Sequence, residues 1–272
     1  MASGAGNADS ARYGPSAGTA ARSNLLLRDL KVALLFLTRF PVQVDGTVTM
    51  RDLAAAVYAF PLVGAAVGLL AGLAYWAALW VGLPALPAAL IAIASMLVMT
   101  GALHEDGLAD TADGLGAGTD RARALEIMAD SRIGSFGTVA LIVVLLARLI
   151  ALAPMWDPRQ VASALVAAAM ASRALMSVVM LLQPSARADG LAAATGRPEP
   201  FRVMLGSFLA IAGAVLLLPL PTAATALVAS AGLSLLLAMW LGRRLGGCTG
   251  DTLGAVQQAA EIAFLFAIVS RQ

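Results

Sequence analysis

Long apolar runs, separated by short polar connections, dominate the chain. Runs that are long enough, or nearly so, to cross a hydrocarbon core of about 30 Å lie at residues 53–81, 86–103, 138–153, 161–182, 203–218, 223–241 and 253–269. The third and fifth runs are short, which leaves the count open by one. The pattern therefore predicts an all-α, polytopic integral membrane protein with about seven transmembrane helices.

The residues before the first run follow a different pattern. Residues 25–40 carry charge throughout and end against Pro41, which predicts an N-terminal interfacial or re-entrant helix. Residues 1–24 are rich in Ala, Gly and Ser and show no apolar periodicity, which predicts a disordered tail. Residues 25–272 then form a single transmembrane domain. Pro61 with Gly64 and Gly68 predicts a kink in the first span.

Composition supports a membrane location. Hydrophobic residues make up 60% of the chain and charged residues 12%, with a mean hydropathy of +0.85, so the lipid bilayer is the expected partner. The net charge of +2 is too small to indicate nucleic acid as a partner. A single cysteine, Cys248, excludes an internal disulfide.

The connections differ sharply in charge. Most Arg and Lys residues lie in 28–52, 104–132, 185–202 and 243–251, whereas 82–85, 154–160 and 219–222 contain Arg159 alone. The positive-inside rule then places all the charged connections in the cytoplasm, on one face of the membrane.

An acidic cluster follows the second run. Asp106, Asp110 and Asp113 are spaced i, i+4, i+7, which on one helix places their carboxylates on one face within roughly 60°. Aligned carboxylates repel one another unless a cation lies between them, and hard oxygen ligands suit Mg²⁺, with Mn²⁺ as the alternative. Asp130, followed by Ser131 and Arg132, is a candidate fourth ligand, and a simple salt bridge at a helix end is the alternative interpretation.

The surroundings of this cluster favour phosphate chemistry. Gly114, Gly116 and Gly118 allow a ligand to approach the backbone, and Arg121, Arg123 and Arg132 supply positive charge. Carboxylate-held metal with nearby arginine suits phosphoryl transfer.

The single histidine is a candidate acid–base or substrate-binding group. On a continuous helix His104 points roughly opposite to the aspartates, unless Gly107 breaks the helix and brings its side chain round.

Arg148 and Arg173 lie inside the apolar runs, so a partner is expected for each of them. Arg173 either faces a bound anion or pairs with Glu261, because a charge within the membrane needs a partner. The segment 246–252 opens the last run, so Thr249 and Asp251 lie at a helix N-terminus that can hold an anion. Asp251 is also explained as a carboxylate that only stabilises this terminus.

Taken in order, these motifs resemble those of the cobalamin synthase family, the adenosylcobinamide-GDP ribazoletransferases. The segments that carry the resemblance are 36–42, 60–64, 104–114, 125–134, 172–173, 186–187 with 190–191, 249–255 and Glu261. The resemblance extends over nearly all of the chain after residue 24, with these segments in matching order along it.

The resemblance implies a Mg²⁺-dependent transfer of phosphocobinamide from adenosylcobinamide-GDP to α-ribazole or its 5′-phosphate, with release of GMP. It implies metal ligation by the four aspartates named above, one of which activates the acceptor hydroxyl. His104 and Arg132 are the further catalytic candidates. Substrate binding is expected of Arg39, Arg121, Arg173, Arg187, Thr249, Asp251 and Glu261.

The same resemblance implies a multi-pass enzyme of the bacterial inner membrane, with its active site on the cytoplasmic face. Residues 25–272 are then the catalytic domain. Assembly as a homo-oligomer, or with other enzymes of corrin synthesis, is left open.

Two other functions are considered. Residues 110–114 resemble the opening of the CDP-alcohol phosphotransferase motif, but the rest of that motif is not matched. A cation transporter would use the aspartates and Glu261 as an ion path. The aspartates follow the end of an apolar run, however, and a permeation site is expected nearer the bilayer midplane.

Overall fold

The computed structural model describes residues 17–116, 118 and 120–271, and the elements in these residues are helices. In chain order they are α1 (Ala17–Leu37), α2 (Met50–Ala55), the 3-10 turn η1 (Val57–Ala59), α3 (Phe60–Trp80), α4 (Ala85–Thr100), α5 (Leu103–Gly116), α6 (Arg121–Met128), α7 (Ser135–Leu152), α8 (Pro158–Leu182), α9 (Leu191–Thr195), α10 (Pro200–Leu217), α11 (Leu220–Leu245) and α12 (Gly250–Val269).

Six of these segments are long and apolar enough to cross a membrane: η1 with α3, α7, α8, α10, α11 and α12. The bent pair of α4 and α5 makes a seventh if it is counted as one span. The predicted all-α, multi-pass membrane fold is confirmed.

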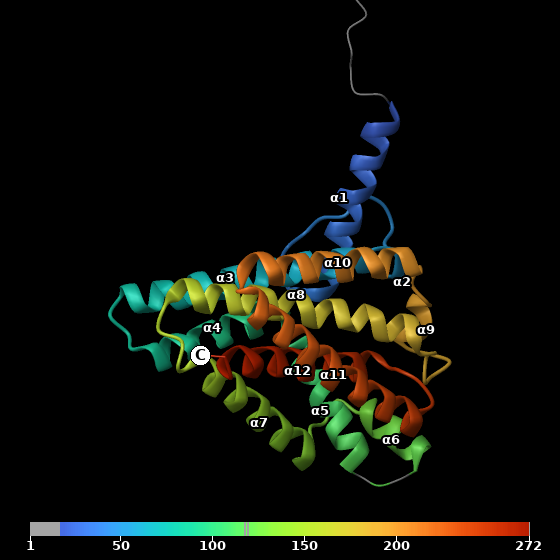
Figure 1. Cartoon of the computed structure of the whole chain (residues 1–272). Coiled ribbons are helices and arrows are strands. Elements are labelled where there is room, and N and C mark those ends of the chain that lie inside the picture. Colours follow the sequence, from blue (N-terminus) through green and yellow to red (C-terminus); the bar gives the residue numbers. More distant parts are fainter. Residues whose placement is uncertain (1–16, 117, 119, 272) are drawn as a thin grey trace, which may run out of the picture.

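Helix α1 runs crosswise to α3, α8 and α10 and projects from the body of the protein (Figure 1). It begins at Ala17, so residues 17–24 are helical and do not belong to the predicted tail; residues 1–16 lie outside the described part of the chain.

Buried Asp29 anchors helix α1 by accepting hydrogen bonds from Tyr58 (3.2 Å) and Arg202 (3.1 Å). Arg28 pairs with Asp52 on α2 at 2.8 Å and lowers the pKa of that carboxyl to about 2. The crosswise orientation is that expected of an interfacial helix.

Close packing of α3 on α8 replaces the predicted kink. Helix α3 is continuous, and Pro61 lies in its first turn, where a missing N–H costs nothing. Gly64, Gly68 and Gly72 face the backbone of α8 so closely that an added Cβ would lie 2.2–2.6 Å from its atoms. Small residues at four-residue spacing permit this approach between membrane helices. The kink prediction was wrong because these glycines serve packing.

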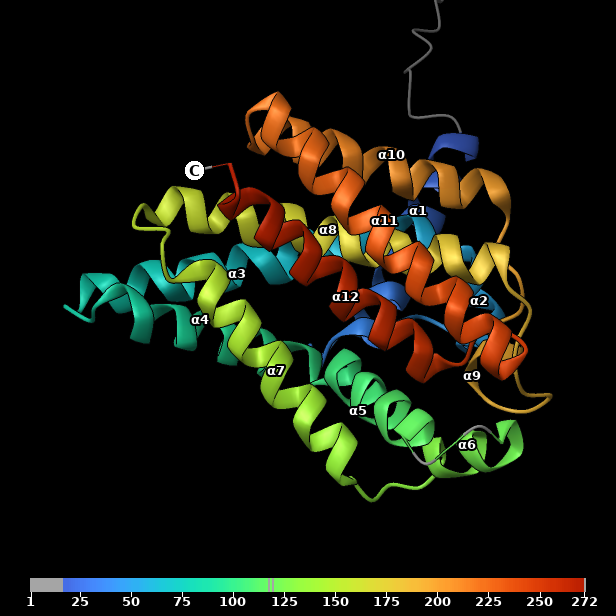
Figure 2. The same cartoon turned by 60° about the horizontal axis from the view of Figure 1, so that its bottom comes forward.

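The charged connections gather at one end of the bundle. Helices α6 and α9 lie at that end, and the turn between α3 and α4 lies at the other (Figures 1 and 2). Helices α8 and α12 are the most enclosed spans. Helix α12 packs against α5, α8 and α11.

A sharp bend gives α5 its position. Helices α4 and α5 meet at 87°. Gly101 (φ 64°) and Ala102 (φ 55°) both adopt the left-handed conformation at the corner. The bend turns α5 away from the direction of α4, and Figure 2 shows α5 beside the start of α12.

Two glycines set the distance between α5 and α12. A Cβ on Gly107 would lie 2.8 Å from the carbonyl oxygen of Asp251, and a Cβ on Gly254 would lie 2.9 Å from that of His104. Gly107 therefore does not break α5, which was one of the expectations from the sequence; it lets α5 approach α12.

Replacing Gly107 by alanine should force the two helices apart. Overpacking of this kind costs about 1–3 kcal/mol, so Gly107→Ala should lower the thermal unfolding temperature of the protein in detergent. Gly232→Ala is the matched control, because a Cβ on Gly232 of α11 meets nothing within 4 Å. Equal unfolding temperatures for the two variants would contradict the assigned contact.

Candidate active site

A pocket of about 170 Å³ lies at the charged end of the bundle. Helices α1, α2, α3, α5, α8, α9 and α12 and the connection between α8 and α9 all contribute to its wall. Of the residues that the sequence singled out, His104, Asp106, Arg187, Thr249 and Asp251 line it. The fold thus brings together three segments that are far apart in the sequence.

Two carboxylates from different helices enter this pocket. Asp106 comes from α5 and Asp251 from the first turn of α12, and the Gly107 contact holds these turns together. Asp110, one turn further along α5, is half-buried. Its carboxyl group feels the negative charges of Asp106, Asp251 and Asp113 and the positive charge of Arg187. Asp251 was expected to bind substrate, and its place beside the α5 aspartates makes it a fourth member of the acidic group.

Asp113 has a different environment from the other two aspartates of α5. Its carboxylate is buried and accepts hydrogen bonds from the backbone N–H groups of Gly134 (2.7 Å) and Gly137 (2.8 Å) at the start of α7. An added Cβ on either glycine would lie within 2.4 Å of the carboxylate oxygens. Asp113 therefore caps α7, where a negative charge also stabilises the helix dipole.

No group of three or more His, Cys, Asp or Glu side chains in the described residues is arranged to hold a metal ion. The donors nearest to such an arrangement are the carboxylates of Asp106, Asp110 and Asp251, which are hard oxygen ligands of the type that Mg²⁺ prefers. Their mutual repulsion favours a cation between them. Metal binding by these residues and by Asp113 stays a prediction.

Asp130 lies in a salt bridge with Arg132. Its carboxylate accepts from Arg132 Nη2 at 2.6 Å, and this arginine holds the pKa of Asp130 below its usual range. The structure therefore shows the local pair that the sequence left open for these two residues. The expected metal and catalytic roles of Asp130 and Arg132 stay predictions.

Two other predicted arginines contact the backbone. Arg121 donates to the carbonyl oxygens of Leu245 (2.6 Å) and Ala186 (2.8 Å) and so links α6 to the end of α11 and to the α8–α9 connection. The exposed Arg39 lies against Gly101 at the α4–α5 corner. Neither residue is among those that line the pocket, and their predicted substrate contacts are untested.

The start of α12 is tied to the α8–α9 connection. The backbone of Cys248 exchanges hydrogen bonds with Pro184 and Ala186 at 2.9 and 2.8 Å. The Thr249 hydroxyl accepts from the N–H of Thr252 at 3.2 Å and caps the helix. Burial raises the pKa of the Cys248 thiol, as expected of a cysteine that only packs. These contacts hold the segments that carry Arg187 and Asp251 close to each other in the pocket wall.

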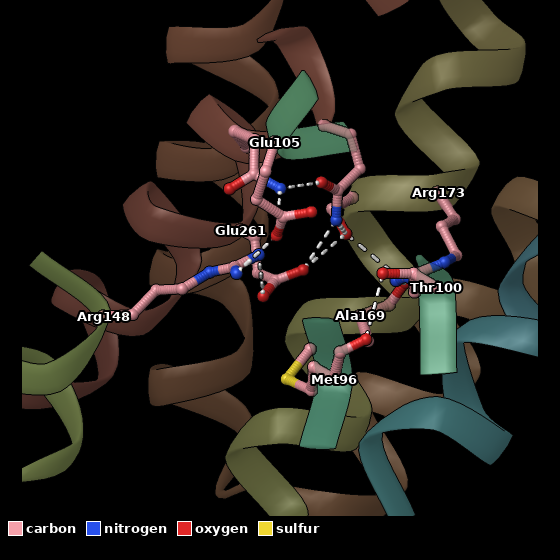
Figure 3. Close-up of polar contacts among 10 residues, drawn as sticks. Met96, Thr100, Glu105, Arg148, Ala169, Arg173 and Glu261 are labelled. Carbon is pink, nitrogen blue, oxygen red and sulfur yellow. Dashed lines mark hydrogen bonds and ion pairs between the residues drawn. The ribbon is translucent and has the colours of Figure 1, made fainter. Parts of the chain in front are cut away.

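A buried polar cluster lies beside the pocket (Figure 3). Arg148 of α7, 2% exposed, pairs with Glu105 of α5 at 2.7 Å and with Glu261 of α12 at 2.8 Å. Gln258 donates to Glu105 at 3.0 Å, and Gln257 donates to Glu261 at 2.6 Å. Each partner lies inside the protein, so the pairs are well shielded from water.

This cluster decides the pairing of Glu261. The sequence left open a pair with Arg173, but Arg148 takes that place. Arg173 lies on the other side of the cluster and donates to Ala169 of its own helix at 3.2 Å (Figure 3). Its Nε, like Nε2 of His104, is buried without a hydrogen-bond partner among the described residues. Neither Glu261 nor Arg173 lines the pocket, and substrate binding by them is untested.

Sequence reasoning assigned no role to Glu105, Gln257 or Gln258. These residues are polar and lie in apolar surroundings. This pattern could have indicated that each has a buried hydrogen-bond partner, because buried polar groups need partners. For Arg148 the expectation of a partner was correct, but the spacing along the chain does not identify a residue on another helix.

Comparison with known proteins supports a family assignment. The sequence profile described as cobalamin-5-phosphate synthase matches residues 29–269. The chain belongs to this family. Proteins named adenosylcobinamide-GDP ribazoletransferase from Azorhizobium caulinodans and Mesorhizobium japonicum are 42% and 44% identical over 91% and 88% of this chain, and over 97% and 92% of their own lengths. A third, from Bradyrhizobium diazoefficiens, is 44% identical over 91% of this chain and 95% of its own.

No solved structure matches the chain. The predicted family is confirmed, and the protein is a transferase of the cobalamin synthase family. The matched region contains the whole pocket wall, from Phe36 to Gly254.

Loss of the Asp113 cap should lower the stability of the protein more than loss of a pocket carboxylate. Asp113→Asn presents an amide to two backbone donors, and an unsatisfied buried group costs about 1–3 kcal/mol. The exposed Asp106 provides the matched variant, Asp106→Asn. Thermal unfolding in detergent should show the lower transition for Asp113→Asn, and the reverse order would exclude the capping role.

Removal of Arg148 should be more damaging, because it leaves two carboxylates buried without their counter-charge. Breaking a buried pair costs about 3–5 kcal/mol, so Arg148→Met should greatly reduce the yield of folded protein. Adding Glu105→Gln and Glu261→Gln should restore much of that yield. Arg159→Met, at an exposed site in the first turn of α8, is the control. Failure of the triple variant to recover would argue against charge imbalance as the cause.

Proposed function

We propose that the protein transfers a phosphocobinamide group from adenosylcobinamide-GDP to α-ribazole or α-ribazole 5′-phosphate, with release of GMP. The names of the relatives support the donor and the acceptor. The observation that carries the proposal is that Asp106 and Asp251 face a common pocket with Arg187. Acidic and basic groups around one cavity suit a reaction between a diphosphate and a hydroxyl.

The acidic residues require a cation for this reaction, because a donor diphosphate would otherwise meet like charge. Asp106, Asp110 and Asp251 would hold Mg²⁺, or Mn²⁺ in its place. When bound, such an ion neutralises charge on the diphosphate and on the departing GMP. The family assignment favours this transferase over a cation transporter or an enzyme that acts on CDP-alcohols.

The chain's own residues would position the substrates and move the proton. Arg187 also lines the pocket and brings positive charge close to Asp110 and Asp251, where it would bind phosphate oxygens. A pocket carboxylate accepts the proton of the acceptor hydroxyl as its oxygen bonds to the phosphorus attached to cobinamide. The bond from that phosphorus to the oxygen of GMP then breaks, so one P–O bond forms and one is lost.

The charged connections support a cytoplasmic active site in a bacterial inner membrane. They lie at the end of the bundle that carries the pocket, and the positive-inside rule places such connections in the cytoplasm.

The test uses purified protein in detergent or liposomes with adenosylcobinamide-GDP and α-ribazole 5′-phosphate. GMP and the corrin product should form together and only with Mg²⁺ or Mn²⁺. Asp106→Asn and Asp110→Asn should each lower turnover by about a hundredfold or more, whereas Asp45→Asn, at an exposed position before α2, should not. Absence of product from folded wild-type protein would refute the proposed reaction, and full activity of both Asp106→Asn and Asp110→Asn would refute the assignment of the carboxylates.

A further inference from the structure

The pocket wall carries two kinds of side chain. The charged and polar ones are His104, Asp106, Ser185, Arg187, Asp189, Thr195, Thr249 and Asp251. The apolar ones include a set from four helices and the short helix α9, which we call the apolar side: Phe36, Leu53, Phe60, Met176, Met180 and Leu191. Leu53, Phe60, Met176 and Met180 are buried, so this side belongs to the interior of the protein and does not face lipid.

The size of the pocket limits what this apolar side can bind. A dry apolar cavity of about 150 Å³ holds one benzene ring, and sites for drug-sized ligands run from about 300 Å³ upwards. A pocket of about 170 Å³ therefore suits one small flat aromatic group. A corrin macrocycle with its amide side chains is several times too large.

We propose that the apolar side binds the benzimidazole base of α-ribazole, and that the corrin of the donor stays outside this pocket. The assignment rests on the proposed function. With the base seated there, the ribose extends toward Asp106 and Asp251, whose carboxylates are available to accept the proton of its hydroxyl.

Chemical complementarity favours this base over the guanine of the donor, which is also flat. Guanine carries hydrogen-bonding groups around its edge, and burying them without partners costs free energy. The benzimidazole carbocycle has an apolar edge that suits the surface of Phe36, Phe60 and the two methionines. Aromatic side chains and thioether sulfurs both make favourable contacts with such rings.

A variant that fills the apolar side provides the first test. Met176→Trp should raise the KM for α-ribazole 5′-phosphate by about tenfold or more, as steric misfit in an apolar pocket does. The KM for adenosylcobinamide-GDP should stay within about twofold of the wild-type value. Met204→Trp is the matched control, because Met204 of α10 is 68% exposed.

A variant that enlarges the apolar side provides the second test. This test does not require the protein to fold with a tryptophan at position 176. Phe36→Ala should weaken selection among bases, so that ribosides of larger aromatic bases are used nearly as well as α-ribazole. Phe208→Ala, which removes a ring that is 65% exposed on α10, should leave selection unchanged.

The outcomes separate the two proposals. If wild-type protein releases GMP but Met176→Trp raises the KM for adenosylcobinamide-GDP alone, the pocket binds the donor and the acceptor assignment is wrong. Unchanged base selection in Phe36→Ala would also overturn it. Failure of the wild-type protein to release GMP would refute the proposed reaction itself.

Discussion

The ion pairs that Arg148 forms with Glu105 and Glu261 constrain the whole arrangement of the site. They join three helices, and hydrogen bonds from Gln257 to Ser172 (3.0 Å) and to Glu261 add α8 to the same cluster. Charges buried in this way are tolerated only with their partners in place. Helices α5, α7, α8 and α12 must therefore adopt their relative positions together. Glu105 immediately precedes Asp106 in the first turn of α5. The buried ion pair of Glu105 therefore fixes this turn, while the Asp106 side chain faces the pocket.

The three aspartates on the acidic face of α5 differ in solvent exposure. Their spacing alone would assign the same function to all three, but their exposure shows that they have different environments. Asp106 is exposed to the pocket, Asp110 is half-buried, and Asp113 is buried against the start of α7. Spacing at i, i+4 and i+7 established that the three lie on one face. It did not show that Gly134 and Gly137 would bring backbone donors to the third. The chain thus uses one helical face both to carry charge to a pocket and to hold a neighbouring helix.

The sequence predicted much of the fold for simple physical reasons. Apolar runs identified the spans because lipid requires continuous apolar surface, and the crosswise helix α1 was visible because charge recurs throughout it. Among the pocket carboxylates, Asp106 was identified by the helical spacing of the acids in its segment, and Asp251 by its place at the start of the last apolar run. The structural features that the sequence did not predict depend on contacts between segments that are distant in the chain. The 87° corner before α5, the approach of Gly107 to Asp251, and the pairing of Glu261 with Arg148 each involve a partner that periodicity does not identify.

The position of the pocket at one end of the bundle follows from the cost of charge in a membrane. Carboxylates and arginines that bind a diphosphate must lose and regain water as substrates exchange, which is expensive near the bilayer midplane. The bend after α4 places α5 where its carboxylates meet the first turn of α12 at the charged end, and the cluster around Arg148 is buried among the helices. Apolar side chains of α1, α3 and α8 extend to the same pocket from the bundle. An end-on pocket therefore places charged and apolar side chains around one cavity.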